Sequence, residues 1–119
     1  AYDGSEDPKA FEERMLADIG MPREIAMRHR PPHFLHVFAG SGYAAGYYSY
    51  MWSEVLDADA FQAFLDNGDI FDPETAKNLH EYIYGAGGTR RGRDAYLAFR
   101  GRLPSVDGLL RQRGLSAVA

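Results

Sequence analysis

The 119-residue sequence has no cysteine, no long apolar run and no leader pattern at its acidic start. Without cysteine the chain can form neither a disulfide nor a thiolate site, which fits a reducing compartment. No apolar run approaches the ~20 residues that a membrane-spanning helix needs. The opening residues, AYDGSEDPK, lack the basic and apolar regions of a signal peptide. We therefore expect a cytoplasmic protein with no membrane partner.

Basic residues are scarce in the first part of the chain, and acidic residues are scarce in the last part. Residues 1–85 hold 6 Lys/Arg and 15 Asp/Glu, a net charge of −9, whereas residues 86–119 hold 7 Arg and 2 Asp, a net charge of +5. An arginine-rich end can indicate nucleic-acid binding. These arginines alternate with apolar residues, however, and only two aromatic residues, Tyr96 and Phe99, stand among them. We expect no nucleic-acid partner, and instead a solvated face or ion pairs with the acidic part.

The common catalytic motifs are absent too. The sequence has no HExxH zinc motif, no GxSxG nucleophile motif and no glycine-rich phosphate or dinucleotide motif. His29, His33 and His36 are the only cluster of metal-ligand types, but two prolines between the first two break the helical spacing that zinc sites use. We therefore predict no metal site in this chain.

A second group of candidate catalytic residues is acidic, and its signal is equally weak. Glu54, Asp57 and Asp59 fall within one expected helix. They fit either a general acid–base pair or a solvated helix face, and their spacing alone does not decide between the two.

Proline, glycine and capping residues predict an all-α fold of four to six helices around one long central helix, at about residues 42–67. Asp7-Pro8 and Asp72-Pro73 each combine an N-cap with a proline at the first helical position. Residues 33–40 are expected to be an extended connection, because no second strand pattern exists for them to pair with. The helices are expected at 7–19, 23–28, 42–67 with Ser41 as its cap, 72–85, 93–99 and 104–114.

The central helix is unusually rich in tyrosine. At a 3.6-residue period, one of its faces carries Tyr43, Tyr47, Tyr50 and Glu54. A neighbouring, more apolar stripe is expected to be core, and comprises Ala44, Tyr48, Met51, Val55 and Ala58.

The hydroxyls of the tyrosine face need partners, so this face lines either a packed interface or a cleft. In a cleft, Tyr43 and Tyr50, together with His36, would reach a reacting carbonyl and donate hydrogen bonds to a developing oxyanion. The glycines of Gly40-Ser41-Gly42, just before Tyr43, would give this loop the freedom to close on a substrate. The residues by themselves suggest an oxyanion donor but no complete catalytic site.

One long stretch, HFLHVFAGSGYAAGYYSYMWSEVLDADAF, closely resembles the C-terminal segment of the thimet oligopeptidase family. Its YAAGYYSY core is similar to the bacterial oligopeptidase and peptidyl-dipeptidase members. The resemblance continues through Gly68-x-Ile70-Phe71, Gly87-Gly88, Phe99-Arg-Gly-Arg102, Pro104 and Gly114-Leu115.

The resemblance implies a mainly helical zinc peptidase of several hundred residues that hydrolyses short peptides. Residues 1–119 would be a single C-terminal fragment of its catalytic domain, with the zinc-binding HExxH upstream and absent here. Zinc would then be a cofactor of the full-length parent and would not be bound by this fragment. The fragment alone would be inactive, and surfaces exposed by truncation could make it self-associate.

The resemblance also implies residue roles. Tyr50 matches the catalytic tyrosine that stabilises the tetrahedral oxyanion. His36, Tyr43, Tyr47, Gly40 and Gly42 match the loop and helix positions that bind substrate. The alternative is a non-catalytic helical interaction module that shares this segment. The sequence does not decide whether the parent is an endopeptidase or releases dipeptides.

Overall fold

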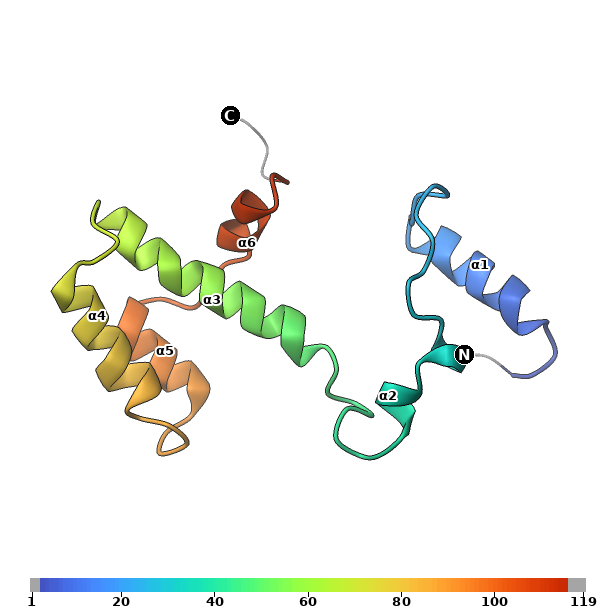
Figure 1. Ribbon diagram of the computed structural model, residues 1–119, viewed down its shortest axis with the longest axis horizontal. Coiled ribbons are helices and arrows are strands. Elements are labelled where there is room, and N and C mark those ends of the chain that lie inside the picture. Colours follow the sequence, from blue (N-terminus) through green and yellow to red (C-terminus); the bar gives the residue numbers. More distant parts are fainter. Residues whose placement is uncertain (1–2, 116–119) are drawn as a thin grey trace. The chain divides into compact units, whose positions relative to one another are not determined.

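The computed structural model describes residues 3–115, and over this range the chain is helical without any strand (Figure 1). It has six α-helices, α1 to α6, and two short helical turns, which confirms the predicted all-α fold. The chain divides into two compact units, Ala1–Ala44 and Ala45–Ala119.

In the first unit, α1 spans Pro8–Asp18, close to the predicted 7–19. The Asp7 carboxylate accepts hydrogen bonds from the backbone N–H groups of Lys9 and Ala10 at 3.0 and 3.1 Å. Pro8 occupies the first helical position, where its missing N–H costs nothing. Gly20 follows the helix at a φ of +77°, a conformation that glycine adopts without strain. Local capping chemistry thus sets both ends of α1.

The next part of this unit differs from the prediction. Residues 23–28 are not a helix; they contain a single turn, in which the Ile25 N–H donates to the Pro22 carbonyl at 3.1 Å. Residues 33–40 are not extended either. The 3₁₀ turn η1 spans Pro31–His33, and the short helix α2 spans Leu35–Phe38. With no strand to pair with, this backbone satisfies its hydrogen bonds locally, and the prolines supply the φ that a helical turn needs.

The central helix α3 spans Ser49–Asp66, so the predicted start near residue 42 is wrong. Residues 40–48 instead form bends and turns. Gly40, Gly42 and Gly46 raise the entropy cost of fixing this stretch as a helix, and Ser41 caps no helix. The predicted end is correct, since Asn67 closes α3 and Gly68 follows at a φ of +75°.

The rest of the second unit packs around the C-terminal half of α3. Helix α4, Pro73–Leu79, continues into a π-helical turn, η2, over His80–Tyr84, and is followed by α5, Gly92–Arg100, and α6, Asp107–Gln112. Helices α4 and α6 contact α3, and α5 contacts η2 (Figure 1). The buried apolar residues of this unit are Ala58, Ala63, Phe64, Ala86, Ala95 and Tyr96.

The predicted apolar stripe on the central helix is therefore only partly core. Ala58 is buried, but Tyr48 and Met51 are 70% and 63% exposed. The reason is that the buried residues of α3 all lie in its second half, at Ala58, Asp59, Ala63 and Phe64.

The last three helices test the predicted boundaries most directly. Asp72 caps α4 through its carboxylate, which accepts from the Thr75 N–H at 2.7 Å, as predicted. Gly101, with a φ of +71°, ends α5. Helix α6 begins at Asp107 and not at Pro104, and its N-cap, Val106, has no side-chain cap hydrogen bond. The Ser105 hydroxyl accepts from the Asp107 N–H at 3.0 Å in the turn before the helix.

Among residues 3–115, no helix is both long enough and apolar enough to cross a membrane.

Candidate functional site

His36 and Tyr43 lie against each other in the first unit. His36 belongs to α2, Tyr43 to the bend that follows, and their ring centroids are 4.7 Å apart with planes tilted by 36°. The stacking continues on the other side of His36, since Phe34 is 6.3 Å from His36 and His29 is 4.8 Å from Phe34. These four rings form an aromatic row that holds the loop histidine next to the loop tyrosine.

Gly40 and Gly42 lie in the exposed bends between α2 and Tyr43. A Cβ atom at either position would meet no atom within 4 Å, and neither has a positive φ. Steric demands therefore do not explain these glycines in the present conformation. They make the backbone between His36 and Tyr43 easy to rearrange.

Tyr47 and Tyr50 form a second aromatic pair, in the second unit. Tyr47 lies in the turn before α3, Tyr50 in the first turn of α3, and their ring centroids are 5.2 Å apart at 58°. The Ser49 N–H donates to the Gly46 carbonyl at 3.0 Å, which closes the turn that leads into the helix. Tyr50 is 54% exposed and Tyr47 38% exposed. Both side chains are accessible at the start of α3.

The structure thus groups the four predicted aromatic residues into two pairs. His36 and Tyr43 belong to the unit that ends at Ala44, and Tyr47 and Tyr50 to the unit that begins at Ala45. Tyr43 does not share a helix with Tyr47 and Tyr50, as the predicted helical face required.

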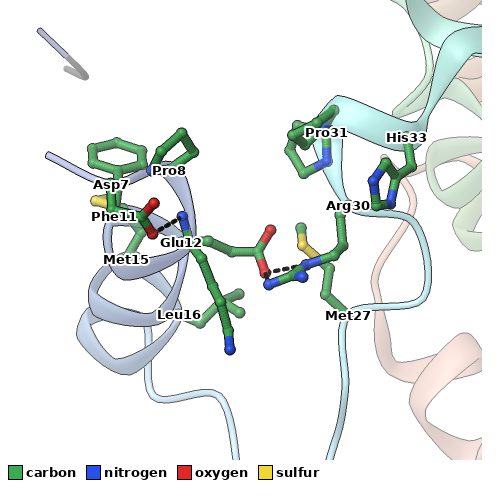
Figure 2. Close-up of a pocket in the computed structure, with 12 residues that line it drawn as sticks. Asp7, Pro8, Phe11, Glu12, Met15, Leu16, Met27, Arg30, Pro31 and His33 are labelled. Carbon is green, nitrogen blue, oxygen red and sulfur yellow. Dashed lines mark hydrogen bonds and ion pairs between the residues drawn. The ribbon is translucent and has the colours of Figure 1, made fainter. Parts of the chain in front are cut away.

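A groove of about 670 Å³ lies in the first unit, between α1 and residues 27–33 (Figure 2). Its lining is mostly apolar, and Phe11, Met15 and Met27 contribute to it. An ion pair crosses it, in which Arg30 Nη2 lies 2.7 Å from Glu12 Oε1. His36 and the four predicted loop and helix residues are not part of its lining. The groove is therefore separate from the candidate site.

Asp59, in the middle of α3, is a buried carboxylate whose role the sequence left undecided. It is 2% exposed. The Tyr96 hydroxyl donates to its Oδ2 at 2.7 Å, Arg102 Nη2 lies 2.8 Å from its Oδ1, and the Ser105 N–H donates to Oδ1 at 3.2 Å. We call this set the Asp59 network. Its one sequence signal is a carboxylate between two alanines, Ala58 and Ala60.

The Asp59 network shifts the pKa values of its members. Burial raises the pKa of Asp59, but the hydrogen bonds from Tyr96, Arg102 and Ser105 outweigh burial and lower it below its usual value. Burial, and then the Asp59 carboxylate, raise the pKa of Tyr96. The carboxylate is therefore ionised and the phenol neutral at neutral pH, which is the state of a structural anchor and not of a proton-transfer pair.

Other arginines of the basic end also pair with acidic residues of α3. Arg100 Nη2 lies 3.2 Å from Asp66 Oδ2, and Arg113 pairs with Glu54. Arg113 and Glu54 are both about half exposed and form a surface ion pair, whereas the Arg100 side chain is only 10% exposed and its Nε also lies 3.5 Å from Asp59 Oδ2. The prediction that the arginine-rich end forms ion pairs with the acidic part is confirmed.

The histidines of this chain do not fit a zinc site. His29 stacks on Phe34 and His36 on Tyr43. Within residues 3–115 no three His, Cys, Asp or Glu side chains are placed so that they could hold a metal ion. The chemistry that these residues can offer is hydrogen bonding and stacking at the two aromatic pairs.

Comparison with known proteins matches residues 6–115 to peptidase family M3. The chain is 51% identical over 87 residues to oligopeptidase A of Haemophilus influenzae, which covers 72% of this chain and 12% of that protein. It is 51% identical over 89 residues to a probable cytosolic oligopeptidase A of Arabidopsis thaliana, covering 72% and 13%. It is 36% identical over 107 residues to a dipeptidyl carboxypeptidase of Salmonella typhimurium, covering 88% and 15%. The chain therefore spans roughly an eighth of the length of these relatives.

Proposed function

Since the chain belongs to peptidase family M3, we propose that it is the C-terminal segment of a larger peptidase that hydrolyses short peptides. The observation that supports this most is the extent of the family match, which runs from residue 6 to residue 115 and includes every predicted site residue. Relatives named oligopeptidase A and dipeptidyl carboxypeptidase both match, so the proposal covers both modes of cleavage.

Tyr50 is the proposed catalytic residue of this segment. Its exposed side chain lies at the start of α3, where a substrate can approach it. Phenols keep their proton at neutral pH, so the hydroxyl can donate a hydrogen bond to the oxyanion that develops when a peptide carbonyl is attacked. The ring of Tyr47 beside it limits the positions that the Tyr50 ring can take. A donor held in place before the reaction stabilises the transition state more than a mobile one.

His36, Tyr43 and Tyr47 are the proposed substrate-binding side chains. His36 and Tyr43 carry polar atoms that can bind the backbone of a peptide, and their stacked rings keep them together. Gly40 and Gly42 allow the loop between them to adjust when a peptide binds.

The resemblance assigns zinc to the parent protein, but the histidines of this chain do not fit it. We therefore place the metal in the part of the parent upstream of this chain, and no step of the chemistry proposed here is routed through it. It follows that residues 1–119 alone are expected to be inactive. The parent is expected in the cytoplasm, with short peptides as its partners.

The test compares Tyr50→Phe with Tyr48→Phe in the full-length parent. Tyr48 is 70% exposed, precedes α3 directly and has no proposed role, so it is the matched control. We expect Tyr50→Phe to lower kcat for a quenched fluorescent peptide by about 10²-fold, the usual loss of one oxyanion donor, with little change in KM. Tyr48→Phe should retain activity.

Two outcomes would contradict the proposal. The first is full activity of Tyr50→Phe in the parent. The second is a parent that binds peptides but never cleaves them, which would favour a helical interaction module. Assay of the 119-residue chain beside the parent tests the expected inactivity, because hydrolysis by the chain alone would show that its own residues suffice.

A further inference from the structure

The second unit has an apolar pocket of about 660 Å³ between α3, η2 and α5. We call it the α3 pocket. Trp52, Leu56 and Ala60 of α3 line one wall, and residues of η2, α5 and the segment after it line the others. The lining outside α3 includes Leu79 at the end of α4 and, from these other segments, Ile83, Tyr84, Tyr96, Leu103 and Pro104.

The α3 pocket continues the core of the unit. Trp52, Leu56 and Ala60 are four residues apart, so they lie on one face of α3. Asp59 and Ala63, which are buried, follow Leu56 and Ala60 by three residues on the same side. The face that packs against the other helices in the second half of α3 is therefore the face that lines the pocket in the first half.

Large apolar side chains remain uncovered at this pocket. Trp52 is 58% exposed, Tyr84 71% and Leu103 46%. A pocket of this size with so much exposed aromatic surface is typical of an interface and not of a finished core. Asp57 and Arg93 also line it and supply one charge of each sign.

The α3 pocket faces away from the proposed catalytic tyrosine. Trp52 and Tyr50 are two residues apart, so they project from roughly opposite sides of the helix, about 200° around its axis. A peptide bound at Tyr50 would therefore not fill the pocket. Its occupant must be sought on the non-catalytic side of α3.

We propose that the α3 pocket is the docking site for an apolar face of the parent's upstream polypeptide, the part that precedes this chain. This inference rests on the proposed function, which supplies a parent. The matched relatives are about eight times as long as the aligned region, so ample chain exists to cover the pocket. The occupant has apolar side chains for Trp52 and Tyr84, and a basic and an acidic group for Asp57 and Arg93. Docking fixes the start of α3 and, with it, Tyr50.

The single tryptophan of the chain gives a direct probe, because Trp52 lines the pocket. The chain is labelled with 5-fluorotryptophan and titrated with the unlabelled upstream polypeptide of the parent, and the ¹⁹F resonance of Trp52 is followed. We expect a new resonance that saturates at one upstream polypeptide per chain. The change in its chemical shift on adding D₂O should be smaller than that of the free chain, because docking removes water from the indole.

Tyr84→Asp and Tyr82→Asp form a matched pair of variants. Both change a tyrosine of the same π-helical turn to the same residue, but only Tyr84 lines the pocket. We expect Tyr84→Asp to weaken the association by about tenfold or more, since it places a charge among apolar side chains. Tyr82→Asp should bind as the unchanged chain does. Circular dichroism of both variants checks that their helices remain.

Three results would overturn the inference. One is a complex in which the Trp52 resonance does not move. Another is equal binding by the Tyr84→Asp and Tyr82→Asp chains. The third is a resonance that moves with the concentration of the chain alone and is unaffected by the upstream polypeptide, which would make a second copy the occupant.

The same pair of variants is also made in the full-length parent, in case the separated upstream polypeptide does not fold. There, Tyr84→Asp should lower the Tm by about 5 °C or more relative to the unchanged parent. Equal Tm values would show that the pocket is open in the parent, and would overturn the inference. The proposed function would still stand if Tyr50→Phe abolished activity in that parent, so the two failures are distinguishable.

Discussion

At the scale of single residues, Asp59 connects three segments of the second unit. It belongs to α3, and its carboxylate binds the Tyr96 hydroxyl of α5, the Arg102 guanidinium and the Ser105 N–H before α6. A carboxylate that is 2% exposed is tolerated only because these donors replace water. Each donor in turn would lose a partner if the carboxylate were removed.

Asp59→Asn should therefore be strongly destabilising. The amide keeps the shape of the side chain but removes the charge that faces Arg102 at 2.8 Å and the nearly buried Arg100 at 3.5 Å, which we expect to cost about 3 kcal/mol of the free energy of unfolding. Glu54→Gln is the control, because Glu54 and its partner Arg113 are both about half exposed, and it should cost less than about 1 kcal/mol. Urea denaturation of the 119-residue chain measures both. Equal losses would show that the Asp59 network is not an anchor.

The lowered pKa of Asp59 also predicts a pH dependence. Because the folded-state pKa lies below that of the unfolded chain, the network stabilises the fold fully above the unfolded value of about 4. This stabilisation is lost as the pH falls through the folded-state pKa. The free energy of unfolding should therefore decrease between about pH 5 and pH 2 by more in the unchanged chain than in Asp59→Asn. Parallel curves for the two proteins would contradict this assignment.

At the scale of elements, the two ends of α5 show how a glycine can have opposite roles. Gly101 ends the helix at a φ of +71°, where any other residue is strained. Gly92 begins the helix with an ordinary φ, and a Cβ atom there would meet nothing within 4 Å. The backbone conformation therefore requires glycine at Gly101 but not at Gly92.

Gly101→Ala should consequently lower the free energy of unfolding by about 1–2 kcal/mol, the cost of a left-handed non-glycine residue. Gly92→Ala should be neutral or stabilise by up to about 1 kcal/mol, because it restricts only the unfolded chain. Thermal unfolding of the two variants gives the comparison. A loss in Gly92→Ala as large as that in Gly101→Ala would be inconsistent with the two backbone conformations.

The π-helical turn is an element that sequence patterns did not predict. The region 72–85 was expected as one helix, and η2 continues α4 within it, but the Gly85 N–H donates to the His80 carbonyl at 2.6 Å, one residue further back than in an α-helix. A Cβ atom at Gly85 would lie only 3.0 Å from that oxygen. The spacing of apolar residues is nearly the same in a π-helical turn and in an α-helical turn. The two differ only in that the N–H bonds to the carbonyl five residues back in place of four, which the sequence does not reveal.

At the scale of the whole molecule, local chemistry explains which predictions were correct. Caps and stop signals are encoded within a few residues, so the ends of α1, α4 and α5 follow from Asp7, Asp72 and Gly101. The start of α3 could not be predicted, because the cost of three glycines competes with a tyrosine pattern of helical period. Nor could the Asp59 network be predicted, because its partners are 37 to 46 residues away along the chain.

The candidate site was predictable to a similar degree. The sequence pattern identified the tyrosines, and the resemblance gave them roles. Neither showed that Tyr43 lies outside the helix that carries Tyr50, since this follows from where α3 begins. Residue identities can thus be recognised from a pattern, whereas their grouping depends on the backbone.

The exposed apolar surface of the chain predicts that it self-associates when separated from the rest of its parent. Tyr48, Met51 and Trp52, which lie just before and in the first turn of α3, are all more than half exposed. Apolar surface of this extent favours association. Light scattering of the 119-residue chain should show a mass that rises with protein concentration. A strictly monomeric chain at high concentration would contradict this prediction.

The long sequence separation within the Asp59 network has a consequence for kinetics. Contacts that close large loops are costly to form early, so the network should assemble after the transition state for folding. Disrupting it with Asp59→Asn should then accelerate unfolding and leave the refolding rate nearly unchanged. Stopped-flow measurements in urea separate the two rates. In this view, the buried carboxylate determines how long the folded chain persists and has little influence on how quickly it forms.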